Sequence, residues 1–318
     1  MKKSSFTKPA TTIDEQFMIL RARGMNFDDG LDKSCIKTIL RNNNYFRLEG
    51  YWFEYYESRL YPEHRFRCQT SFRYIWNDYR GDSLLRHAIF ELIEIFELSF
   101  RSVMANVLAR NHGPFPYGID DFDCSCDAHA EVLGRITGAV HHSKDIFIKK
   151  FHEHYSNPLP PIWMIVEIMS LGELSRIYGI CLKAFDKKEI ASHYGVPAPV
   201  LESWIRSIVH VRNRCAHHNR LLGVHIPGGF RIPHRFDGGI YGSLFATSER
   251  NGLYNIMVAL CYLCDRIGES DRKRRFLTQL ILMADTFHID CQRLGFPEHV
   301  TIENLTTLIK SNEFKRRA

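Results

Sequence analysis

The feature that most constrains the fold is a long run of helical hydrophobic periodicity across residues 82–110. Its apolar positions recur every three or four residues, at Leu85, Ile89, Leu92, Ile93, Phe96, Phe100, Val103, Met104 and Val107. This spacing predicts an amphipathic helix whose apolar face must pack against other helices. A chain organised around such a helix is expected to be a helical bundle.

Helical patterns also cover most of the remaining sequence, and strand signals are few. Further helices are expected at 13–23, 31–42, 128–154, 162–185, 187–194, 200–222, 248–268, 271–293 and 301–314. The fold class is therefore mainly α. Three regions are predicted: a small mixed or helical N-terminal module at 1–78, a helical core at 79–225, and a Gly/Pro-rich loop with C-terminal helices packed on the core at 226–318.

Charge and cysteine usage narrow the functional classes. The 42 Lys and Arg exceed the 36 Asp and Glu by six, which permits a phosphate or nucleic-acid partner but is modest for an architectural DNA binder. The nine cysteines are odd in number and scattered, as expected for reduced thiols in the cytoplasm. We expect no signal peptide and no membrane helix, because the longest apolar run, 253–264, is shorter than the roughly 20 residues needed.

The run from Val211 to Arg220 carries the most chemistry. It combines arginines, asparagines and two histidines near the end of the helix predicted at 200–222. The Arg guanidinium has a fork geometry suited to phosphate, and His both accepts and releases a proton near neutral pH. Together these side chains are a minimum set for cleaving a phosphodiester without a metal.

Helical geometry divides this helix into two faces. The face expected to be buried carries Trp204, Ile208, Val211, Cys215 and Leu222. The opposite face carries Arg206, His210, Asn213, His217 and Arg220. Arg212 and His217 are five residues apart, which separates them by about 140° on an ideal helix. Either the helix is distorted near the motif, or two copies of the chain each contribute part of one site, as in a symmetric dimer.

An ordered set of motifs, and not this run alone, carries a family resemblance. It comprises Gln16 and Leu20 before Gly24, Asn44-Tyr45-Phe46-Arg47-Leu48-x-Gly50-Tyr51, Leu84-Leu85-Arg86 with Glu94 and Arg101, Trp163-x3-Glu167-x4-Gly172-x2-Ser175, and Arg212-Asn213-x-Cys215-Ala216-His217-His218-x-Arg220-Leu221. The set is similar to the abortive-infection AbiD/AbiF family of bacterial phage-defence proteins. The Arg-Asn-x3-His element resembles the signature of HEPN-domain ribonucleases.

The resemblance implies a HEPN-type helical bundle that cleaves RNA without a metal, as a homodimer with a composite active site. Arg212 would then stabilise charge on the transition state, Asn213 would position the histidine or the phosphate, and His217 would transfer the proton. The expected product is a 2′,3′-cyclic phosphate, which DNA cannot form because it lacks the 2′-hydroxyl. Possible substrate contacts are Arg206, His210, His218 and Arg220.

Other interpretations stay open at this point. The same residues suit a non-catalytic module that holds a structured RNA partner or antitoxin, and a HEPN scaffold that only dimerises is a third alternative. We expect no metal, because Cys124-x-Cys126 and Cys261-x2-Cys264 lack a second ligand pair at suitable spacing. No cofactor is expected, because the sequence contains no P-loop, dinucleotide glycine pattern or Gly-x-Ser-x-Gly element.

Overall fold

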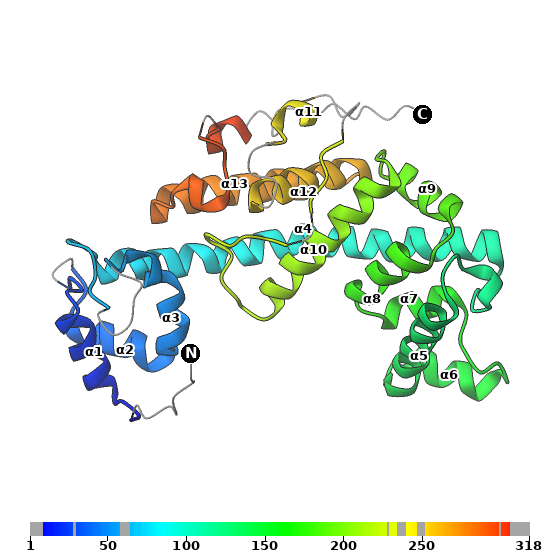
Figure 1. Ribbon diagram of the computed structural model, residues 1–318, viewed down its shortest axis with the longest axis horizontal. Helices are drawn as coiled ribbons and strands as arrows, with labels where there is room; N and C mark the ends of the chain where they lie inside the picture. The colour runs from blue at the N-terminus through cyan, green and yellow to red at the C-terminus, as the bar shows by residue number, and fades with distance from the viewer. Residues whose placement is uncertain are drawn as a thin grey trace, which may run out of the picture. The chain divides into compact units, whose positions relative to one another are not determined.

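The computed structural model describes residues 9–27, 30–57, 64–227, 229–233, 240–246, 252–298 and 300–305. The described chain is mainly α-helical, as predicted, and its only extended pairings are isolated bridges (Figure 1). It forms two compact units, one of residues 1–84 with 283–289 and the other of 85–282 with 290–318. Within the described ranges, every helix is too short or too polar to cross a membrane.

The first unit packs three short helices around an aromatic core. These are α1 (Ile13–Ala22), α2 (Lys33–Asn42) and α3 (Tyr45–Trp52), followed by the single turn η1 (Phe53–Tyr55). Thr12 and Glu15 form a capping box that starts α1. Trp52 is fully buried and meets the rings of Tyr45 and Phe66 edge-on. Burial of such large rings supplies most of the cohesion of a module this small.

The long helix α4 (Phe72–His112) extends through the periodic segment and begins ten residues before it. Its first turns contain buried acidic side chains, which the hydrophobic periodicity would assign to the surface. Tyr51 donates a hydrogen bond of 2.6 Å to Asp82, and Tyr55 donates one of 3.4 Å to Asp78. A buried carboxylate needs such donors, because an unsatisfied one destabilises the fold. Tyrosines distant in sequence therefore allow the helix to start early.

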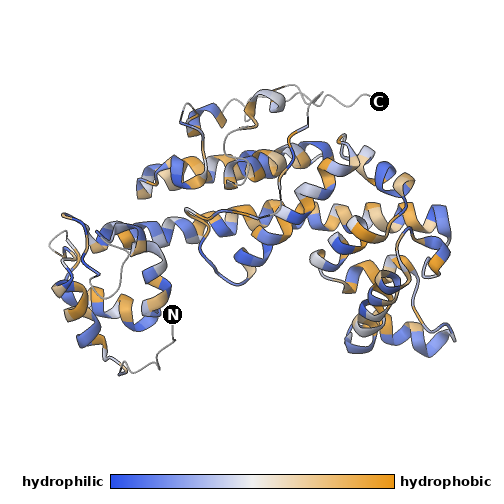
Figure 2. Cartoon of the chain, viewed as in Figure 1, coloured by the Kyte–Doolittle hydropathy of each residue, from blue (hydrophilic) through white to orange (hydrophobic). Residues whose placement is uncertain are grey.

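After α4, two segments predicted as single helices, 128–154 and 162–185, are each divided into shorter ones. The elements that follow α4 are α5 (Cys126–His142), α6 (Ile146–His154), α7 (Ile162–Ile168), α8 (Leu171–Arg176), a π-helical turn (Ile177–Cys181) and α9 (Ala184–His193). The helix expected at 128–154 breaks before Asp145, which caps α6. The one expected at 162–185 breaks at Ser170, where a capping box with Glu173 starts α8. Along α5 and α6 hydrophilic and hydrophobic residues occupy different faces (Figure 2).

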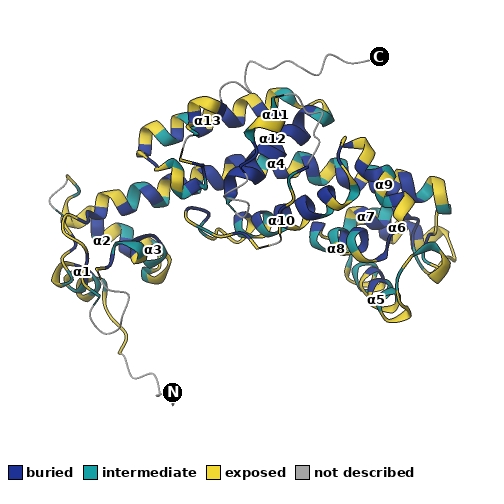
Figure 3. Cartoon of the chain, turned by 45° about the horizontal axis from the view of Figure 1, so that its top comes forward, coloured by how far each residue is buried: buried dark blue, intermediate teal, exposed yellow. Residues whose placement is uncertain are grey.

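The last helices build the core of the second unit around α12 (Leu253–Ile267), which is buried along almost its whole length (Figure 3). The other elements are α11 (Tyr241–Leu244), α13 (Ser270–Phe287) and η4 (Cys291–Leu294); the helix expected at 301–314 lies mostly outside the described residues. The basic run on α13 is largely neutralised. Arg272 and Arg275 pair with Glu91 of α4, and Lys273 is buried against Asp265 at 2.7 Å.

Candidate active site

The helix that carries the motif, α10 (Ala198–Ala216), is held by a dense apolar face. Trp204 is fully buried, stacks on Phe230 with ring centroids 5.7 Å apart, and donates a hydrogen bond of 2.9 Å to the carbonyl of Arg231. Val211 and Cys215 continue the same face and are also buried. This part of the predicted division into two faces is confirmed, and it fixes the rotation of the helix about its axis.

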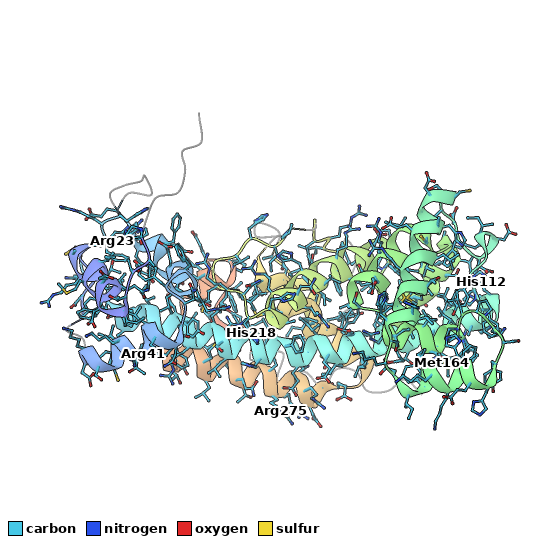
Figure 4. The ribbon with its side chains drawn as sticks, turned by 90° about the horizontal axis from the view of Figure 1, so that it is seen from below. Arg23, Arg41, His112, Met164, His218 and Arg275 are labelled. Carbon is cyan, nitrogen blue, oxygen red and sulfur yellow. The ribbon has the colours of Figure 1, made fainter. Side chains whose placement is uncertain are left out.

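The helix ends at Ala216, six residues before the predicted end at 222. His217 is the C-cap, and His218, labelled in Figure 4, adopts a left-handed backbone with φ of 55°. The amide of His218 donates to the carbonyl of Cys215, and the amide of Asn219 donates to that of Arg214. This pair of bonds is a Schellman motif, which usually has glycine at the left-handed position. A histidine there stores backbone strain next to the motif.

The segment after the helix is tied back to it by Arg214. Its guanidinium donates to the carbonyl of Arg220 through both Nε, at 2.8 Å, and Nη2. Leu221 and Leu222 are buried immediately afterwards. The prediction that Leu222 packs in the core is therefore confirmed, but both it and Arg220 lie in this segment and not on a helix face. Arg220 is half-buried and its carbonyl, not only its side chain, has a structural role.

Arg212 points toward α4 and pairs with a carboxylate there. Its Nε lies 3.5 Å from Oε2 of Glu97, an ion-pair distance, although Nε itself has no hydrogen-bond partner. Glu97 also accepts a bond of 2.5 Å from Arg101, and Arg101 donates to the carbonyls of Val166 and Met169. One carboxylate that is 13% exposed therefore stands between two guanidinium groups. This arrangement holds Arg212 against α4, while its side chain remains 30% exposed to solvent.

The sequence analysis did not assign Glu97 to the site. Glu97 and Arg101 lie one helical turn apart on α4, and they form an ion pair. The ion pair with Arg212 joins residues far apart in the chain, so helix spacing carries no signal of it. The one available hint is a Glu between the core residues Phe96 and Phe100, since acidic residues on an apolar face are seldom buried without a partner.

Asn213 and His217 lie on the exposed side of the helix end. Both residues are exposed, and neither side chain forms a hydrogen bond or ion pair within the described part of the chain. Arg212, in contrast, turns inward to Glu97. The three residues of the predicted catalytic set are thus close in sequence, but in one copy the cation and the histidine have different surroundings.

The remaining predicted contacts differ in their surroundings. Arg206 pairs with Glu202 one turn earlier, so its charge is partly balanced by a carboxylate on the same helix. His210 is half-buried, and burial, aided by the charge of Arg214, lowers its pKa. It is therefore neutral near pH 7. His218 is exposed beside His217.

No metal-binding cluster of three or more His, Cys, Asp or Glu side chains occurs among the residues that the structure describes. Cys261 and Cys264 lie on α12 and are both buried, and burial raises the pKa of the Cys261 thiol to about 12. Thiols of this kind are poor ligands, because metals bind the thiolate. Cys126 is the first residue of α5 and is exposed, and Cys124 lies two residues before it and is half-buried.

Comparison with known proteins adds one decisive match. A family model described as Abi-like protein covers residues 38–223, more than half of the chain. The chain belongs to the Abi-like protein family. No curated protein and no solved structure matches it. The matched range of this Abi-like protein extends from α2 through α10 and includes Arg212, Asn213 and His217. Membership suggests a role in abortive infection.

Proposed function

We propose that this Abi-like protein is a metal-independent RNA endonuclease of the HEPN type that acts as an abortive-infection toxin. The observation that carries the proposal is the end of α10. There Arg212, anchored on Glu97 by an ion pair, is followed directly by the exposed Asn213, and the exposed His217 lies slightly more than one helical turn further on. Family membership supports the biological setting.

The chemistry follows from these side chains. A ribose 2′-oxygen attacks the adjacent phosphorus, and the bond from phosphorus to the 5′-oxygen breaks, leaving a 2′,3′-cyclic phosphate and a 5′-hydroxyl. His217 takes the proton from the 2′-hydroxyl or gives one to the departing 5′-oxygen. Arg212 stabilises the negative charge that builds up on the phosphoryl oxygens, and Asn213 donates from its amide to hold the phosphate.

We further propose that two copies of the chain complete the site. Arg212 is drawn toward α4, whereas His217 projects from the exposed end of the helix. A two-fold axis near this helix end brings the His217 of one copy to the Arg212 of the other.

The test is cleavage of single-stranded RNA in the presence of EDTA by the full chain and its variants. We expect His217→Ala and Arg212→Ala each to lower the rate by about 100-fold or more, since positioned acid–base and charge-stabilising groups contribute that much. His141→Ala is the matched control, because His141 is an exposed histidine in the last turn of another helix. Cleavage that persists in both variants contradicts the site.

Growth arrest on expression should follow the same pattern. Tight, salt-sensitive RNA binding by the wild-type chain without any cleavage would instead identify the non-catalytic RNA-binding function, because phosphate contacts release counterions and lose affinity in salt.

A further inference from the structure

The first compact unit contains a cavity of about 730 Å³ that the proposed active site does not use. It lies among α1, α3 and the chain near His64. Its wall includes Thr11, Gln16, Arg23, Tyr45, Phe46 and Glu49. A volume of this size is typical of a small-molecule site, which roughly spans 300–1,000 Å³.

A charged pair is fixed in the wall of this cavity by two tyrosines. Nη1 of Arg23 donates to the hydroxyl oxygens of Tyr45 and Tyr56, at 3.2 and 3.5 Å. The hydroxyl of Tyr56 in turn donates to Oε1 of Glu49 at 3.4 Å. Burial raises the pKa of both tyrosines, so their hydroxyls remain protonated donors. The Arg23 guanidinium and the Glu49 carboxylate are therefore linked through the hydroxyl of Tyr56. Arg23 is labelled in Figure 4.

An aromatic ring stands at the rim of the same cavity. Phe46 is 75% exposed, the most exposed large hydrophobic residue described. Its backbone is fixed at the start of α3, because its amide donates to the side chain of Asn44 at 2.9 Å. Its ring meets Tyr45 edge-on with centroids 6.0 Å apart. An exposed ring on a rigid helix turn offers a flat face for another aromatic group to stack on.

One acceptor in the lining has no partner. Oε1 of Gln16 is buried and forms no hydrogen bond within the described residues, and its Nε2 reaches Thr11 only at 3.5 Å. Buried polar atoms nearly always have a partner, so this acceptor is available to a donor group on a bound ligand.

We propose that this cavity binds a single unstacked guanine base of an RNA strand, an inference that rests on the proposed function for its choice of RNA. The base stacks on Phe46. Its N1–H and N2 amino donors face Glu49, and its O6 and N7 acceptors face Arg23, the atom pair that arginine binds in guanine elsewhere. Adenine has an acceptor at N1 where guanine has a donor, so the Glu49 carboxylate disfavours adenine. Single-stranded RNA presents its bases in this unstacked form.

The experiment measures binding to the full chain carrying His217→Ala, which removes the proposed cleavage. The probes are labelled uridine-rich RNAs that differ only in one central nucleotide, guanosine or adenosine. We expect tighter binding of the guanosine probe. Phe46→Ala should weaken it by about 5- to 100-fold, the usual contribution of one stacked base. Glu49→Gln should remove the preference for guanosine over adenosine.

The matched control is Phe53→Ala, since Phe53 is also an exposed ring of this unit, at 43%, but does not line the cavity. Equal thermal midpoints of the two Phe variants confirm that both are folded. Competition by unlabelled GMP, but not by UMP, also supports a base in the cavity. GMP binding that depends on Phe46, with no effect of Phe46→Ala on RNA binding, overturns the assignment to RNA. Equal binding by the Phe46 and Phe53 variants overturns the site.

Failure of this inference is distinguishable from failure of the proposed function. If Phe46→Ala and Glu49→Gln bind the guanosine probe like the control while His217 remains essential for cleavage, only the cavity assignment is wrong. If His217→Ala still cleaves RNA but the cavity variants lose the guanosine preference, only the active site is wrong.

Discussion

Glu97 is the residue whose replacement tests the site geometry most sharply. Glu97→Gln keeps the shape of the side chain but removes the charge shared by Arg101 and Arg212. Removing one partner of a buried ion pair costs about 3–5 kcal/mol. Arg101 retains the carbonyls of Val166 and Met169, and Arg212 is partly solvated, so we expect a loss of about 2 kcal/mol.

Urea unfolding followed by circular dichroism measures this loss directly, as a lower midpoint with an unchanged slope. For a unit of this size the same loss lowers the melting temperature by about 4–8 °C. Glu94→Gln, on the exposed side of the same helix, is the control and should change stability by no more than about 0.5 kcal/mol. Equal midpoints for the two variants would refute the bridging role of Glu97.

Three further outcomes follow from other groups. His218→Gly should stabilise the protein by about 0.5–1 kcal/mol in urea, since glycine relieves the left-handed strain, whereas Ala216→Gly in the helix should destabilise it. Burial lowers the pKa of His210 and His193, so the unfolded chain binds more protons and stability should fall as pH drops below 6.5; replacing both with Gln should flatten this dependence. Cys261, with its pKa raised to about 12, should react with a thiol reagent at pH 8 only after unfolding.

The periodic segment predicted the central helix well, because an apolar face of that length has few alternatives. Its true start at Phe72 was missed, since Asp78 and Asp82 look like surface residues until Tyr55 and Tyr51 are seen to satisfy them. The break at Ser170 was readable from local sequence, because Ser-x-x-Glu is a capping box.

The end of the motif helix shows a different limit. A glycine just after a helical segment usually marks the end of the helix, and Gly223 therefore predicts an end at 222. The observed helix ends earlier, at Ala216. The chain instead turns at His218, whose left-handed backbone is stabilised by the bond from Arg214 to the carbonyl of Arg220. Exposure of Asn213 and His217 followed from helical spacing. The inward turn of Arg212 did not, because Glu97 lies on a distant helix. The chemical roles of these residues stay predictions.

Mixing two inactive variants tests the composite site most directly. Arg212→Ala and His217→Ala chains are purified separately, combined under conditions that exchange subunits, and assayed for RNA cleavage in EDTA. Each mixed dimer holds one complete site if the two residues come from different copies, so cleavage should recover to about a quarter of the wild-type rate. A mixture as inactive as either variant alone would contradict a site shared between two copies.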